Sequence, residues 1–287
     1  MSTIAVLLSQ AEEVLKGSNI PDAGRQAVSL MQFALGRDRA FLIAHPEYEL
    51  NLREQELFGS VVLRRSRREP LQYIVGKQEF YGLDIVVNPD VLIPRPETEI
   101  LVERAIEITG TARPNSILEI GIGSGCISIA ILKHCPAASG LGVDISDRAI
   151  RVAQQNASMH GVDGRLRLLS SDVFSDVGPE RFDLIVSNPP YVPKSDLNGL
   201  QPEVRDHEPV LALTDGDTGL RIIERIVGGA PEHLKPGGHL LVEIGFGQSE
   251  KVREMTETGA WGTVELLADL QGIPRILSAR LAETKEH

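Results

Sequence analysis

The sequence has little of what membrane, disulfide-rich or metal-binding proteins need. It contains two cysteines in 287 residues, Cys126 and Cys135, too few for a disulfide framework and without the spacing of metal ligands. No run approaches the ~20 uninterrupted apolar residues of a membrane-spanning helix. Residues 1–4 lack the basic start and apolar block of a signal peptide. These absences predict a cytoplasmic protein with no metal site.

Positive charge is also scarce. Lys and Arg number 29 against 40 Asp and Glu, a net charge of −11, which argues against binding nucleic acid mainly through its phosphates. The acidic excess lies in residues 86–287 (19 basic, 29 acidic), because residues 1–85 hold 10 basic and 11 acidic side chains. The nearly neutral part contains the cluster Arg64-Arg65-Ser66-Arg67-Arg68, which is either a solvated helix end or a docking patch for an acidic partner.

Three regions differ in their hydrophobic pattern. Residues 1–72 carry apolar side chains at three- and four-residue spacing, which predicts a small helical domain that we interpret as recognising the substrate. Residues 73–95 predict a β-hairpin linker, with short strands at 80–83 and 84–87. Residues 96–287 alternate strand and helix, which predicts an α/β domain with a mostly parallel sheet.

This third region predicts seven strands and five helices. The last two strands are close in sequence, so we expect them to form an antiparallel hairpin. The expected strands are 116–120, 141–143, 165–169, 183–187, 239–244, 263–267 and 275–281. The expected helices are 97–109, 127–134, 147–160, 220–234 and 248–258.

A glycine loop follows the first strand of this sheet. Its sequence is Gly121-Ile122-Gly123-Ser124-Gly125, preceded by Glu119-Ile120. Glycines let backbone approach a ligand closely, and the following helix offers free N–H groups. The third glycine of the dinucleotide fingerprint would fall at Cys126, which argues against NAD or FAD.

Two further strand ends carry carboxylates. Asp144 can accept both hydroxyls of a ribose, although a helix N-cap is the competing interpretation. Asp172 could meet the exocyclic amine of an adenine while Val173 packs on its ring, although Asp172 could equally be an ordinary loop residue. With the glycine loop, these positions predict a site for an adenosine-containing cofactor.

Asn188-Pro189-Pro190-Tyr191 indicates the reaction class. The Asn188 side-chain oxygen and the Pro189 carbonyl can accept the two hydrogens of a planar NH₂ group, and Tyr191 offers it an aromatic face. An amide nitrogen is a poor nucleophile, and these contacts would pull electron density toward it and align its lone pair with a methyl donor. A Pro-Pro turn with a capping asparagine is the structural alternative.

The sequence resembles the bacterial protein-(glutamine-N5) methyltransferases that modify peptide chain release factors. Besides Asn-Pro-Pro-Tyr, the matching strings are Arg68-Glu69-Pro70-Leu71-Gln72-Tyr73-Ile74-Val75-Gly76, Val91-Leu92-Ile93-Pro94-Arg95-Pro96-Glu97-Thr98-Glu99, Glu203-Val204-Arg205-Asp206-His207-Glu208-Pro209 and Glu243-Ile244-Gly245. Gly272-Ile273-Pro274-Arg275 departs from the family, which usually has an acidic residue before the arginine. Arg95-Pro96-Glu97-Thr98-Glu99 favours the release-factor branch over the related ribosomal-protein enzymes.

The resemblance implies a Rossmann-like class I methyltransferase fold that binds S-adenosyl-L-methionine. Gly121 to Gly125, Asp144, Asp172, Val173 and Asn188 would hold this cofactor. Asn188, Pro189, Pro190 and Tyr191 would hold the glutamine of a Gly-Gly-Gln loop. Arg95 and Glu97 would shape the substrate entrance, and His207 would be structural. We expect a monomer that binds release factors but neither nucleic acid nor membranes.

Three other functions compete. A glutamine methyltransferase for a ribosomal protein shares the Asn-Pro-Pro-Tyr motif. An adenine-N6 methyltransferase for nucleic acid also uses it, but should carry a basic groove or a recognition domain. A nucleotide-binding regulatory protein would have no use for the geometry of that motif.

Overall fold

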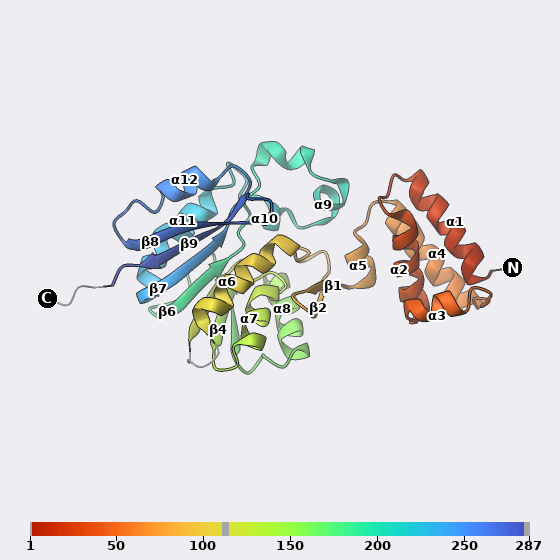
Figure 1. The fold of residues 1–287 in the computed structure, drawn as a ribbon, viewed down its shortest axis with the longest axis horizontal. Coiled ribbons are helices and arrows are strands. Elements are labelled where there is room, and N and C mark those ends of the chain that lie inside the picture. The colour runs from red at the N-terminus through yellow and green to blue at the C-terminus, as the bar shows by residue number, and fades with distance from the viewer. Residues whose placement is uncertain (1, 111–114, 284–287) are drawn as a thin grey trace. The chain divides into compact units, whose positions relative to one another are not determined.

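The computed structural model describes residues 2–110 and 115–283 and divides into two compact units (Figure 1). The first unit comprises Met1–Lys77 and Gln201–His207, and the second comprises Gln78–Leu200 and Glu208–His287. The chain therefore leaves the second unit after the Asn-Pro-Pro-Tyr motif, contributes one short helix to the first unit, and returns.

The first unit is helical, as predicted. Its helices are α1 (Ile4–Gly17), α2 (Ala23–Leu35), α3 (Arg39–Ala44), α4 (Leu52–Ser66), α5 (Leu71–Val75) and α9 (Pro202–His207). A capping box starts α4: the Asn51 side chain accepts from the Glu54 N–H, and the Glu54 carboxylate accepts from the Asn51 N–H. Apolar side chains of α1, α2 and α4 form the unit's core, including Leu15, Leu30 and Val61.

The second unit contains a seven-stranded sheet with the order β5-β4-β3-β6-β7-β9-β8. The pairs from β5 to β7 are parallel, whereas β9 is antiparallel to both β7 and β8. The strands are β3 (Ser116–Ile120), β4 (Ser139–Asp144), β5 (Leu166–Ser170), β6 (Phe182–Ser187), β7 (Leu234–Glu243), β8 (Trp261–Ala268) and β9 (Pro274–Leu281). The mostly parallel sheet with a final antiparallel hairpin is confirmed.

Helices cover both faces of this sheet (Figure 1). On one face, α11 (Arg221–His233) and α12 (Ser249–Glu254) pack over apolar side chains of β3, β6, β7 and β9. On the other lie α6 (Glu99–Thr109), α7 (Cys126–His134) and α8 (Asp147–Met159). The short element η1 (Pro96–Thr98) occupies the start of the helix predicted at 97–109, whereas η2 (Lys194–Gly199) and α10 (Val210–Leu213) lie in loops and were not predicted.

Several predicted boundaries were wrong. The small hairpin consists of β1 (Lys77–Phe80) and β2 (Leu83–Val86), because Tyr81 and Gly82 take positive φ values of 52° and 74° and make the turn. Strand β7 begins at Leu234 rather than at 239, and α12 ends at Glu254 rather than at 258.

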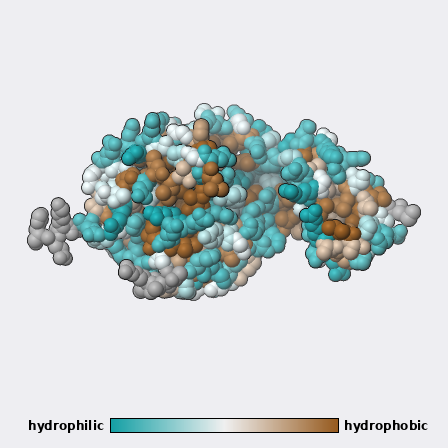
Figure 2. All heavy atoms as spheres, in the orientation of Figure 1, coloured by the Kyte–Doolittle hydropathy of each residue, from teal (hydrophilic) through white to brown (hydrophobic). Residues whose placement is uncertain are grey.

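Most large apolar side chains are buried in the two cores, and on the visible face of each unit hydrophobic areas lie between hydrophilic ones (Figure 2). Among the described residues, no helix is both long and apolar enough to span a membrane.

Candidate active site

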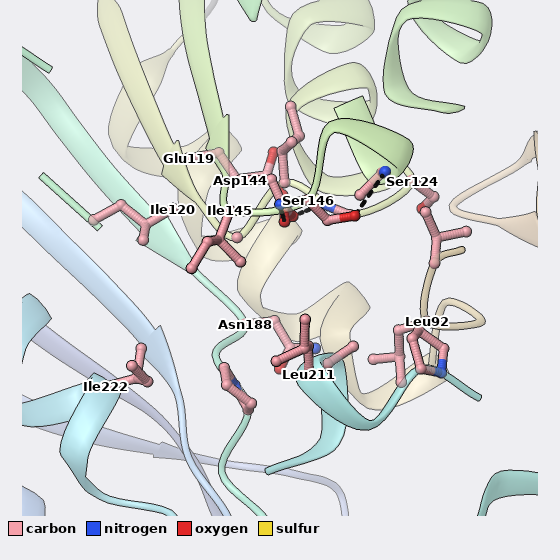
Figure 3. A pocket seen from close by; sticks show the side chains of 18 of the residues that line it. Leu92, Glu119, Ile120, Ser124, Asp144, Ile145, Ser146, Asn188, Leu211 and Ile222 are labelled. Atoms are coloured by element: carbon pink, nitrogen blue, oxygen red, sulfur yellow. Dashed lines mark hydrogen bonds between the residues drawn. The ribbon is translucent and has the colours of Figure 1, made fainter. Parts of the chain in front are cut away.

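The carboxyl ends of the parallel strands open into a cavity of about 470 Å³. Figure 3 shows Glu119, Ser124, Asp144 and Ser146 on one side of this cavity and Leu92, Asn188 and Leu211 on the other. The predicted site residues that line it are Gly121, Ile122, Gly123, Ser124, Asp144, Asp172, Val173, Asn188 and Pro190. The structure thus brings together residues from four separate segments of the sequence.

The glycine loop bends tightly from β3 into α7. Gly121, Gly123 and Gly125 have φ values of 72°, 54° and 82°, which residues other than glycine rarely adopt. The N–H groups of Gly121 and Ile122 donate to the Val143 carbonyl at 2.8 and 2.9 Å. These bonds fix the loop to the neighbouring strand β4.

Asp144 at the end of β4 buttresses the same loop. Its Oδ2 accepts from the Gly123 N–H at 2.9 Å, and its Oδ1 accepts from the Ser146 N–H at 2.9 Å. Burial raises the pKa of Asp144, while these backbone hydrogen bonds oppose the rise. The N-cap of α8 is Ser146, whose hydroxyl accepts from the Ala149 N–H, so Asp144 does not cap this helix. Each carboxylate oxygen keeps a lone pair for a further donor.

Asp172 and Val173 lie beyond the end of β5. Asp172 Oδ1 accepts from Arg225 Nη1 at 2.8 Å, so this carboxylate is already paired with a guanidinium. Val173 is buried and has a φ of 59°, an unusual conformation for a β-branched residue. Backbone strain of this kind often accompanies a binding function, although the adenine contact stays a prediction.

The Asn-Pro-Pro-Tyr segment follows β6. Asn188 and Pro190 line the cavity, and Asn188 Nδ2 donates to Thr98 Oγ1 at 3.1 Å. Tyr191 is not part of the described cavity lining: its ring packs against the core and its hydroxyl donates to Glu243 Oε1 at 3.1 Å. Tyr191 therefore contacts the core and Glu243, while the predicted stacking on a substrate stays untested.

Three buried polar residues support this site and were missed as site residues in the sequence. Asn156 is fully buried in α8 and donates to the carbonyls of Ser124 and Val86, which ties the glycine loop to the β1–β2 hairpin. Glu119 accepts from the Ser128 N–H at 2.8 Å, and burial raises its pKa to about 8. Glu243 is held by two hydroxyls, and burial raises its pKa to about 7. Only Glu119 and Glu243 gave a sequence signal, since both lie in quoted motifs.

The arginine cluster makes its contacts within the first unit. Arg65 is buried and bonds Gln26 and Glu203, and Arg68 also bonds Glu203. Arg64 pairs with Glu69, which lowers the pKa of that carboxyl. Arg65 and Arg68 therefore anchor α9, whereas Arg64 and Arg67 are exposed at the end of α4. The docking of an acidic partner stays untested.

Arg95, in contrast, belongs to the second unit. It lines the cavity, and its Nη2 lies 2.6 Å from Oε1 of the buried Glu208. Oε2 of Glu208 accepts from the Ile93 N–H. Glu97 and His207 do not belong to the cavity lining in the part of the chain that the structure describes. Nor does that part contain three His, Cys, Asp or Glu side chains grouped as metal ligands.

The order of strands, the helices on both faces and the glycine-lined cavity define a Rossmann-like class I methyltransferase fold. Solved structures agree: a methyltransferase from Pyrococcus furiosus superposes with a TM-score of 0.53 over 71% of this chain and 91% of its own, at 19% identity. The hMettl16 catalytic domain with a MAT2A 3′UTR hairpin gives 0.59 over 87% and 94%, at 15% identity. At these identities the likeness concerns the fold alone.

Sequence relatives identify the family. The model of the PrmC N-terminal domain matches residues 6–76, and that of the methyltransferase small domain matches residues 97–200. The release factor glutamine methyltransferase of Geobacter sulfurreducens is 44% identical over 97% of both chains. The enzyme of the same name from Koribacter versatilis is 40% identical over 97% of this chain and 98% of its own. This chain belongs to the release factor glutamine methyltransferase family, which confirms the predicted resemblance.

Proposed function

We propose that this enzyme transfers the methyl group of S-adenosyl-L-methionine to the side-chain amide nitrogen of the glutamine in the Gly-Gly-Gln loop of peptide chain release factors. The observation that carries the proposal is one cavity, in a chain of this family, lined by both the glycine loop and the Asn188 carboxamide. The proposed substrate acts in translation, which would place the reaction in the cytoplasm.

The residues on the β3–β4 side of the cavity fit the cofactor. Gly121 to Ser124 line the cavity, whereas Gly125 does not, and the Asp144 carboxylate has acceptor capacity left for two ribose hydroxyls. Val173 lines the same cavity with an apolar surface suited to an adenine ring. When bound, the cofactor supplies an electrophilic methyl group on a sulfonium.

The proposed role of Asn188 is to orient the amide that is methylated. In the described residues its Oδ1 accepts no hydrogen bond, whereas its Nδ2 is held by Thr98. Oδ1 can therefore accept one N–H of the substrate. We assign the other N–H to the Pro189 carbonyl, as the motif predicts, although Pro189 itself is not in the cavity lining. Two such contacts would hold the nitrogen lone pair toward the methyl group and lower the entropic cost of reaction. The N-methylated amide cation formed by the transfer is strongly acidic, so it would lose one N–H proton to water without a dedicated base.

The helical unit would recognise the body of the release factor, as residues 1–72 predict. We further propose that the enzyme is a monomer. We also propose that it does not bind nucleic acid, and the net charge of −11 supports this second statement. Light scattering during gel filtration and a mobility-shift assay with tRNA would test both statements.

The test is incubation with S-adenosyl-L-methionine and a purified release factor, followed by peptide mass spectrometry. One added methyl on the Gly-Gly-Gln glutamine is expected. Asn188→Ala should lower kcat by about 10²–10³-fold, as loss of an orienting polar group does, with cofactor affinity within a few-fold. An unmodified release factor, with cofactor binding demonstrated, would reject this substrate and direct the search first to ribosomal proteins and then to nucleic acid.

A further inference from the structure

A chain of three hydrogen bonds holds the Asn188 carboxamide through its NH₂ group. Asn188 Nδ2 donates to Thr98 Oγ1 at 3.1 Å, and Thr98 Oγ1 donates to Glu243 Oε2 at 2.7 Å. Tyr191 donates to the other carboxylate oxygen, Glu243 Oε1, at 3.1 Å. Thr98 and Glu243 are each 2% exposed, so water does not replace these partners. The chain connects η1, the end of β6 and the end of β7.

The number of available hydrogens sets the direction of this chain. A carboxylate only accepts, so the single hydroxyl hydrogens of Thr98 and Tyr191 both point to Glu243. The Thr98 oxygen then has only lone pairs left for Asn188. The asparagine must therefore turn its NH₂ group toward Thr98 and its Oδ1 the other way. The position of the side chain alone would not decide between the two orientations, because turning the carboxamide by 180° exchanges its nitrogen and oxygen with almost no change in shape.

We propose that Thr98 and Glu243 are positioning residues that hold the Asn188 carboxamide with Oδ1 facing the substrate amide. This inference rests on the proposed function, because only an NH₂ substrate requires an acceptor at that point. If the carboxamide turned over, its own NH₂ group would face the NH₂ group of the substrate. One hydrogen bond would be lost, and two donors would be left in contact inside a buried site.

The direction of the chain depends on the ionisation of Glu243. A protonated Glu243 can donate to Thr98, Thr98 can then donate to Asn188, and Asn188 would accept with Oδ1 and present its NH₂ group to the cavity. Burial is the main cause that raises the pKa of Glu243, to about 7, and Glu97 adds to it. The titratable and charged groups around Glu243 are Tyr191 after β6, Glu97 in η1, Arg275 in β9 and Cys126 in α7. The charge of Arg95 acts in turn on Tyr191, where it opposes the rise in pKa that burial causes. Methylation at saturating substrate should therefore increase as pH rises through about 7.

The test compares two substitutions at residue 98. Thr98→Val keeps the shape and removes the hydroxyl, whereas Thr98→Ser keeps the hydroxyl. At pH 8 we expect Thr98→Val to lower kcat by about 10–100-fold, the range seen when a group that orients a site residue is removed. Thr98→Ser should stay within about threefold of the wild type. The dissociation constant of S-adenosylhomocysteine should be unchanged in both, since neither substitution alters the glycine loop or Asp144.

Two further measurements exclude a merely structural effect. Adding Thr98→Val to Asn188→Ala should cost no additional activity, because the carboxamide that Thr98 orients is already absent. Glu243→Gln cannot ionise, so it should abolish the rise near pH 7. In the orientation in which its amide accepts from Tyr191 and donates to Thr98, the chain is reversed and kcat should fall. A purified release factor serves as substrate throughout.

The outcomes separate this inference from the proposed function. Wild-type activity in Thr98→Val, or equal losses in Thr98→Val and Thr98→Ser, would overturn the positioning role while methylation by the wild type stands. An additive loss in the double variant would also overturn it. If the wild type does not methylate the release factor at all, the proposed function fails instead. Should Glu243→Gln not fold, the pair at residue 98 and the double variant still decide.

Discussion

Replacement of Asp144 by alanine should selectively weaken cofactor binding. The carboxylate holds the Gly123 and Ser146 N–H groups at 2.9 Å each and, in the proposed site, also accepts two ribose hydroxyls. A hydrogen bond to a charged group contributes about 1.5–3 kcal/mol. The two ribose hydroxyls bond water instead when the carboxylate is removed, so we take the lower value for each bond. The binding free energy should then fall by about 3 kcal/mol, which raises the dissociation constant roughly 150-fold.

Isothermal titration calorimetry with S-adenosylhomocysteine measures this loss directly. Asp144→Asn is the matched control, since it keeps the side-chain size and one acceptor oxygen, and it should weaken binding by only about tenfold. Far-ultraviolet circular dichroism and thermal unfolding would establish that both variants are folded. A dissociation constant for Asp144→Ala within threefold of the wild type would remove this residue from the ribose site. Equal large losses in both variants would point instead to the anchoring of the glycine loop.

Three further predictions concern stability. Burial raises the pKa of Glu119 to about 8, so between pH 4.5 and 8 the folded state binds more protons than the unfolded state, and stability falls as pH rises. Glu119→Gln should therefore gain several degrees in Tm over the wild type between pH 6 and 8.5; a constant difference would contradict this sign. Gly219→Ala would place a Cβ 2.1 Å from the Tyr191 carbonyl oxygen, whereas Gly216→Ala, at a similar φ, meets nothing within 4 Å. Urea unfolding should find the former less stable by about 2 kcal/mol or more, and equal costs would refute the steric reason. Arg65→Met should destabilise the protein by about 1–3 kcal/mol, because Gln26 and the Glu69 carbonyl lose their buried donor while Glu203 keeps only Arg68. Hydrogen exchange should increase in residues 201–207, while the exposed Arg67→Met should change neither.

The sequence was most informative where one residue type is required by backbone geometry or by one face of an element. The glycines of residues 121–125 need positive φ values, and the apolar runs of β3 and β6 must be buried on both faces, so loop and strands were placed correctly. Boundaries failed where a turn used non-glycine residues, as at Tyr81, or where a strand continued through glycine and proline, as in β7.

The path of the chain between the two units was not predictable in the same way. Nothing in residues 201–207 distinguishes a loop of the catalytic unit from a helix that belongs to the helical unit. Glu203 bonds this segment to the helical unit, since it accepts from Arg65 and Arg68, which lie 138 and 135 positions earlier. Local periodicity carries no information about such a pairing, so the arginine cluster could be read only as an exposed feature.

The hydrogen-bond chain behind Asn188 marks the same limit at the level of chemistry. The sequence identified Asn188 by its neighbours in the chain, yet the orientation of its carboxamide depends on Thr98 and Glu243, which are 90 and 55 positions away. A threonine after two prolines and a glutamate at a strand end each have ordinary structural roles when taken singly. Because both are buried, each donor has a single acceptor, and the hydrogen bonds from Asn188 to Thr98 and from Thr98 to Glu243 therefore all run in one direction. The motif residues alone therefore do not define such a site. Whether a planar amide meets an acceptor or a donor depends on Asn188, and equally on which hydrogens Thr98 and Glu243 have available to donate.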